Sequence, residues 1–236
     1  MLNGVKTWLS NGGIALSYGA VVGWVYFAGI AFGVLAADDR TVREIEQALR
    51  IAERSSDDLA LALSRMTLGT ALAHRPTTAE RDREQKLLAE VSEVYRRRGH
   101  NLSELPIVDV YAARETARCG DRDDAIPLIR SAVDHLFRDE GLLAWGVPAT
   151  GVLVEVLLDR GAAADVAEAE AAIEQLAGAR ADEGLVIRDI WLLRLRALLA
   201  RTLHDAAAYT HFRDRYRDMA KSLGYEGHMV WAETMP

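Results

Sequence analysis

The sequence predicts an all-α fold, a tetratricopeptide-like superhelix of about five irregular antiparallel helical hairpins. Apolar residues recur at helical spacing along most of the chain, with almost no strand-like alternation. Residues 120–133 are typical of the turn and second helix of a hairpin, because Gly120 ends one helix, Asp121 caps the next and an apolar stripe follows. Similar turn signals return at Gly161, 41 residues later, and at His204, 43 residues after that. Both intervals exceed the roughly 34 residues of a tetratricopeptide unit, so we expect longer helices or longer loops.

The first 37 residues differ from the rest of the chain. We expect residues 1–11 to be an N-terminal lead and residues 12–236 to be a single helical-repeat domain. Residues 12–37 carry no charge, and we expect an apolar first helix or helix pair there, covered by the next hairpin or by a second copy of the chain in a homodimer. The length of this segment would suffice to cross a bilayer, but its six glycines and Ser17 argue against a membrane span.

The later helices follow from apolar stripes and capping signals. Ser, Thr or Asp residues favour their starts, and Gly or Pro residues favour their ends. The expected ranges are 40–55, 57–73, 78–98, 105–119, 123–140, 145–159, 165–177, 186–203 and 205–223. The last six ranges pair in chain order as three hairpins.

Composition and charge favour a cytoplasmic protein that binds neither nucleic acid nor membrane. The 236 residues are 50% hydrophobic and 27% charged, as in ordinary globular proteins. A formal charge of −7 gives no basic footprint for nucleic acid. The single cysteine, Cys119, excludes an internal disulfide and suits a reducing compartment. We expect its side chain to fill a small apolar space at a helix end.

No catalytic, cofactor or metal site is expected, so the sequence predicts a protein that is not an enzyme. A P-loop requires glycine before Lys-Ser or Lys-Thr, and neither Lys6 nor Lys221 follows a glycine. The aspartate pair at Asp38 and Asp39 is interpreted as a helix-start cap. The histidines form no close pair with metal-site support, and we expect them at the surface or in loops. They are His74, His100, His135, His204, His211 and His228.

Four residues are candidates for binding a partner. Tyr111, Arg114, Trp191 and Arg194 fall on the first helices of predicted hairpins. If they line the concave side, they form a groove with aromatic anchors and cations for an acidic helix or peptide.

Two C-terminal stretches carry a resemblance to a known family. Residues 187–200 and 216–236 resemble the end of mycobacterial multidomain class III adenylate cyclases, in which a cyclase domain and an ATPase module precede a helical-repeat tail. The similarity extends upstream through residues 36–39 and 44–49 and so covers most of the chain. It implies a regulatory, protein-interaction role without cyclase or P-loop motifs, and a partner such as a cyclase, an ATPase or a transcriptional regulator.

Two other hypotheses remain open from the sequence. The chain could be a truncated remnant of a nucleotide-cyclase signalling enzyme. It could also be a helical-repeat adaptor anchored in a membrane by residues 12–37.

Overall fold

The computed structural model describes residues 18–54, 58–75, 80–98, 105–138, 143–179 and 185–235, and these residues form eleven helices and no strand. The all-α prediction is confirmed. The helices are α2 (Tyr18–Ala31), α3 (Asp39–Arg54), α4 (Asp58–Ala73), α5 (Arg81–Arg98), α6 (Leu105–Arg118), α7 (Arg122–Arg138), α8 (Leu143–Arg160), α9 (Ala163–Gly178), α10 (Val186–Thr202), α11 (Ala206–Leu223) and α12 (Glu226–Thr234). Each range expected between residues 40 and 223 coincides with one of these helices, and no bound differs by more than three residues. Helix α12 was not predicted.

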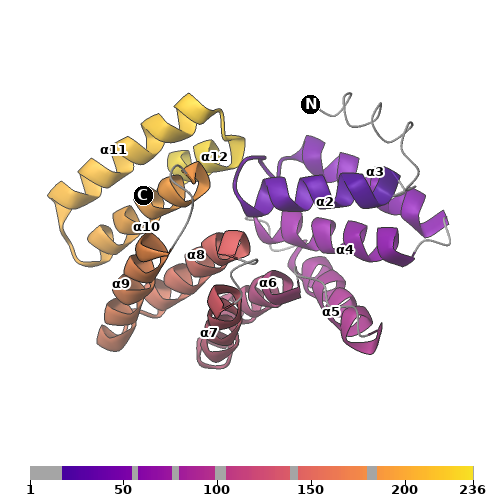
Figure 1. Ribbon diagram of the computed structural model, residues 1–236, viewed down its shortest axis with the longest axis horizontal. Helices are drawn as coiled ribbons and strands as arrows, with labels where there is room; N and C mark the ends of the chain where they lie inside the picture. Colours follow the sequence, from indigo (N-terminus) through magenta and orange to yellow (C-terminus); the bar gives the residue numbers. More distant parts are fainter. Residues whose placement is uncertain are drawn as a thin grey trace.

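The helices alternate between two positions in an arc (Figure 1). Helices α4, α6, α8 and α10 contact one another in succession and form what we call the inner row. Helices α5, α7, α9 and α11 each pack on the inner helix that precedes them in the chain. Antiparallel hairpins that stack on their neighbours produce this alternation, and it leaves one face of the inner row turned toward the middle of the arc.

The turns that end three inner helices share a positive φ angle. Gly120, Gly161 and His204 follow α6, α8 and α10, and their φ angles are 113°, 73° and 58°. Residues in this left-handed region close the last helical turn, as in the hydrogen bond from the Asp205 amide to the Ala200 carbonyl at 2.9 Å. The turn signals at 120, 161 and 204 therefore mark equivalent positions of the stacked hairpins.

The apolar N-terminal segment contains one helix in its described part. Residues 1–17 lie outside the described residues, α2 follows, and residues 32–38 form a turn, a bend and a short irregular stretch. Gly23 of α2 approaches α4 closely, and its carbonyl accepts a hydrogen bond from the Thr67 hydroxyl at 2.7 Å. Within the described part of the chain, no helix combines the length and the apolar character that a membrane crossing requires.

Helix α12 closes the arc by returning to the loop after α2. The backbone amides of Glu226 and His228 donate hydrogen bonds to the carbonyls of Val34 and Gly33, at 3.0 and 2.9 Å. Gly227 lies between them, where a Cβ atom would come within 2.8 Å of two carbonyl oxygens of the loop. Helix α12 thus joins the last part of the described chain to the loop after α2, and it lies beside the inner row (Figure 1).

Candidate ligand-binding groove

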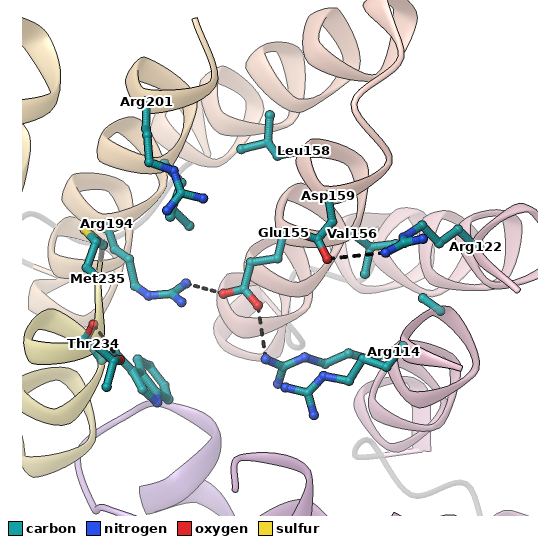
Figure 2. A pocket seen from close by; sticks show the side chains of 14 residues that line it. Arg114, Arg122, Glu155, Val156, Leu158, Asp159, Arg194, Arg201, Thr234 and Met235 are labelled. Atoms are coloured by element: carbon teal, nitrogen blue, oxygen red, sulfur yellow. Dashed lines mark hydrogen bonds and ion pairs between the residues drawn. The ribbon is translucent and has the colours of Figure 1, made fainter. Parts of the chain in front are cut away.

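Three equivalent positions of the inner row carry an ion triad. Arg114 of α6, Glu155 of α8 and Arg194 of α10 follow one another at intervals of 41 and 39 residues. The Glu155 carboxylate accepts a hydrogen bond from Arg114 Nη2 at 3.1 Å with one oxygen, and from Arg194 Nη1 with the other (Figure 2). The triad therefore connects three consecutive inner helices.

The triad is shielded from solvent, so its charges act strongly on one another. The side chains of Arg114, Glu155 and Arg194 are 15%, 21% and 14% exposed. Burial alone would raise the pKa of Glu155, but the charges of Arg194 and Arg114 outweigh it and lower that pKa to about 2. Burial alone would lower the pKa of Arg194, but the Glu155 carboxylate raises it. Glu155 and Arg194 are therefore both charged at neutral pH.

Aromatic rings surround the triad on the side of α12. The guanidinium of Arg194 lies 5.5 Å from the ring centroid of Trp191 and 5.2 Å from that of Trp231, in cation–π geometry. Trp231 also stacks on His74, and His74 meets the edge of Tyr111. Helix α12 thus contributes a tryptophan to the middle of the inner row.

The structure brings the four sequence-predicted residues to one place. Arg114 and Arg194 share Glu155, and Tyr111 and Trp191 lie one helical turn before them on the same faces. The two aromatic side chains are buried, with 1% and 3% exposure. Their role in binding a partner stays a prediction.

Three adjoining cavities, all lined by Trp231, follow the inner row beside α12. The first, of about 310 Å³, lies among α6, α8, α10 and the end of α12. The second, of about 290 Å³, contains His74 and Tyr111 in its wall, and the third, of about 400 Å³, reaches the loop before α3. We call these three cavities together the central groove.

The first cavity is rich in arginine, and we call it the arginine pocket. Its charged lining is Arg114, Arg118, Arg122, Arg194 and Arg201, with Glu155 and Asp159 (Figure 2). Arg118 binds the buried Glu115 carboxylate at 2.7 Å, and Arg122 lies 3.8 Å from Asp159. The side chain of Arg201 forms no ion pair or hydrogen bond with any residue that the structure describes. Positive charge therefore exceeds negative charge in the pocket, although the whole chain is acidic.

Two expectations about individual side chains were wrong. His228 is fully buried instead of lying at the surface, because its Nδ1 meets the Tyr216 hydroxyl at 2.9 Å and its Nε2 meets the Phe32 carbonyl at 3.1 Å. Burial lowers the pKa of His228 to about 3, and the charge of Arg194 acts in the same direction. Cys119 is exposed instead of filling an apolar space, since it lies in the turn after α6.

Metal ligands do not gather in the described part of the chain. No group of three or more His, Cys, Asp or Glu side chains there lies close enough together to hold a metal ion.

Sequence reasoning did not select Glu155, Trp231 or His228. The spacing of the turns could have identified Glu155. This residue lies 41 residues after Arg114, and the same interval separates Gly120 from Gly161. Trp231 and His228 carried no such signal, because α12 has no counterpart among the hairpins.

Comparisons with protein-family models, with curated proteins and with solved structures found no match to this chain. The resemblance to the tails of multidomain adenylate cyclases and the role it implies stay predictions.

Proposed function

We propose that this chain is a non-catalytic protein-interaction module, a tetratricopeptide-like superhelix whose central groove binds an acidic segment of a partner protein. The observation that carries the proposal is the groove itself. It runs along the inner row, where stacked helical repeats present their binding surface, and arginines line its first two cavities.

Charge supports an acidic occupant. The chain has a net charge of −7, so most of its surface repels an acidic segment, whereas Arg122 and Arg201 offer positive charge at the groove. Complementary potential of this kind selects a partner and orients its approach more than it adds affinity.

An apolar residue beside these charges supports a peptide over a simple ion. Val230 of α12 lines the second and third cavities and is 47% exposed, although the neighbouring Trp231 is partly buried. An acidic segment that also carries an apolar side chain would cover Val230 while its carboxylates reach the arginines.

The resemblance to adenylate cyclase tails supports a regulatory role for this interaction. Under this proposal the partner is a cyclase, an ATPase or a transcriptional regulator, met in the cytoplasm, and the groove holds it without chemical turnover. A homodimer through α2, where Trp24 and Val25 are partly exposed, would leave the groove accessible.

Site-specific cross-linking tests the proposal. Val230 is replaced by p-benzoylphenylalanine, the full-length chain is irradiated in a lysate of its source organism, and cross-linked peptides are identified by mass spectrometry. We expect cross-links to an acidic segment of one identified protein, and competition by that segment as a synthetic peptide. The matched control places the same group at Leu128 of α7, which is 61% exposed and does not line the groove. Equal labelling from both positions, or no specific product from Val230, would overturn the proposal.

A further inference from the structure

We propose that the arginine pocket is a binding site for a phosphate monoester. The site does not rest on the protein-interaction role, because its ligand group is small and its binding is measured without a partner protein. Phosphate monoesters occur both in small metabolites and on phosphorylated side chains, and the pocket would recognise the group that the two share.

The balance of charge selects a dianion. The buried Glu115 carboxylate neutralises Arg118 from outside the pocket. The other four arginines of the pocket face only Glu155 and Asp159, which leaves an excess of two positive charges. A phosphate monoester carries a charge of about −1.5 to −2 at neutral pH and matches this excess, whereas a carboxylate would leave half of it uncompensated.

Hydrogen-bond donors of the arginines remain available for such a group. The Arg201 guanidinium has no hydrogen-bond or ion-pair partner in the described part of the chain, and Arg122 is 3.8 Å from Asp159, too far for a good hydrogen bond. Each guanidinium has five N–H donors, so these groups can serve several phosphate oxygens.

The donors converge from opposite sides. In Figure 2, Arg194 and Arg201 extend from α10 on one side of the cavity, and Arg114 and Arg122 lie on the other side. Planar carboxylates present two oxygens in one plane, and Glu155 already uses that arrangement between Arg114 and Arg194. A tetrahedral phosphate presents three terminal oxygens in different directions and fits donors that come from opposite sides of the cavity, on α6, α7 and α10.

The size of the pocket limits the rest of the ligand. Its volume of about 310 Å³ is at the lower end of the range of about 300 to 1,000 Å³ for ligand pockets. Leu198, Trp231 and Met235 line it beside the arginines and offer an apolar wall. A phosphate on a small apolar or aromatic group therefore suits the pocket.

Isothermal titration of the full-length chain tests the inference, with phenyl phosphate as the probe and benzoate as its carboxylate counterpart. We expect saturable binding of phenyl phosphate and at least about tenfold weaker binding of benzoate, because charged hydrogen bonds are lost. Arg201→Gln should weaken phenyl phosphate binding about tenfold, and Asp159→Asn should strengthen it. Arg215→Gln is the matched control, since Arg215 is an exposed arginine of α11 outside the pocket.

Circular dichroism of each variant confirms that the helices are retained. Equal affinities of wild type and Arg201→Gln, or equal affinities for phenyl phosphate and benzoate, would overturn the inference. A further arm compares free phosphoserine with a phosphoserine hexapeptide. Tighter binding of the peptide would identify a phosphorylated protein as the source of the group, and equal binding would identify a small molecule. A failed cross-link at Val230 would leave these titrations unaffected.

Discussion

His228 donates a hydrogen bond from Nε2 to the backbone carbonyl of Phe32 at 3.1 Å, across 196 positions of sequence. A carbonyl only accepts, so the neutral ring carries its proton on Nε2, and its Nδ1 accepts from the Tyr216 hydroxyl at 2.9 Å. The ring thus ties α12 to the loop after α2 and to α11. In an open repeat array each unit contacts only its neighbours, whereas this contact links the two ends of the arc.

Substitution of Gly227 by alanine tests how much the closure stabilises the fold. The added Cβ would lie 2.8 Å from the carbonyl oxygens of Gly33 and Leu35, and backbone atoms cannot move aside cheaply. We expect the free energy of unfolding to fall by about 2 kcal/mol, measured by urea denaturation.

Gly178→Ala is the matched control, because no heavy atom lies within 4 Å of the Cβ that it would add at the end of α9. We expect it to raise stability by up to about 1 kcal/mol, the difference in helix propensity. Equal effects of the two substitutions would show that the contact between α12 and the loop contributes little.

Two histidines with lowered pKa values, His74 and His228, should make the fold sensitive to mild acid. Burial lowers the pKa of His74 and of His228 to about 3, from 6.5 in an exposed state, and Arg114 and Arg194 act in the same direction. As the pH falls, the two histidines therefore become protonated in the unfolded chain at a higher pH than in the folded chain. The contribution of the two neutral histidines to the free energy of unfolding is therefore complete above pH 6.5. It decreases as the pH falls from 6.5 toward 3, by about 1.4 kcal/mol per histidine and pH unit.

Urea denaturation of wild type and His228→Gln at pH 7 and pH 5 measures this dependence. Glutamine does not titrate, so the free energy of unfolding of the variant should fall between pH 7 and pH 5 by only about half as much as that of the wild type. His211→Gln, at an exposed site on α11, should keep all of it. The same decrease in all three proteins would contradict a neutral, buried His228.

The helices could be predicted from the sequence because their signals are local. The stripe of Val42, Ile45, Leu49 and Ala52 in α3 is buried as expected, and Asp38 caps this helix by accepting from the Thr41 amide at 2.7 Å. Arg114 and Arg194 were selected because they fall on first helices of predicted hairpins, and both side chains contact Glu155. Such signals need only the residues of one helix or one turn.

The closing contact could not be predicted in this way. Helix α12 is short, and its apolar residues follow no hairpin pattern. His228 is buried only because Phe32 and Tyr216 supply partners for both ring nitrogens, and one of these partners is 196 residues away. Nothing within residues 226–234 specifies those partners.

Substitution of Glu155 by glutamine tests the ion triad. The variant leaves Arg114 and Arg194 largely buried without their counter-charge, so we expect the free energy of unfolding to fall by about 3 kcal/mol at pH 7. The pKa of Glu155 is lowered from 4.5 to about 2, so its stabilising effect is present above pH 4.5 and is lost as pH falls toward 2. Unfolding of the variant should lack that acid-dependent step.

Glu174→Gln serves as the control for a solvent-exposed pair. Glu174 is 66% exposed and lies 3.3 Å from Arg196, so we expect a change of less than about 1 kcal/mol. If Glu155→Gln were as mild as this control, the triad would not stabilise the inner row.

An exchange between two turns tests whether the repeat positions are equivalent. His204 has a φ of 58°, whereas Gly161 holds the matching place after α8 with a φ of 73°. An L side chain in this conformation costs about 1 to 2 kcal/mol, and glycine avoids that cost. We therefore expect His204→Gly to raise the free energy of unfolding by up to about 1 kcal/mol, part of the gain being offset by the more flexible unfolded chain. Gly161→His should lower it by about 1 to 2 kcal/mol in the same urea titrations. A common repeat geometry requires that the two substitutions change the free energy of unfolding in opposite directions. Changes of the same sign would show that the two turns are not equivalent.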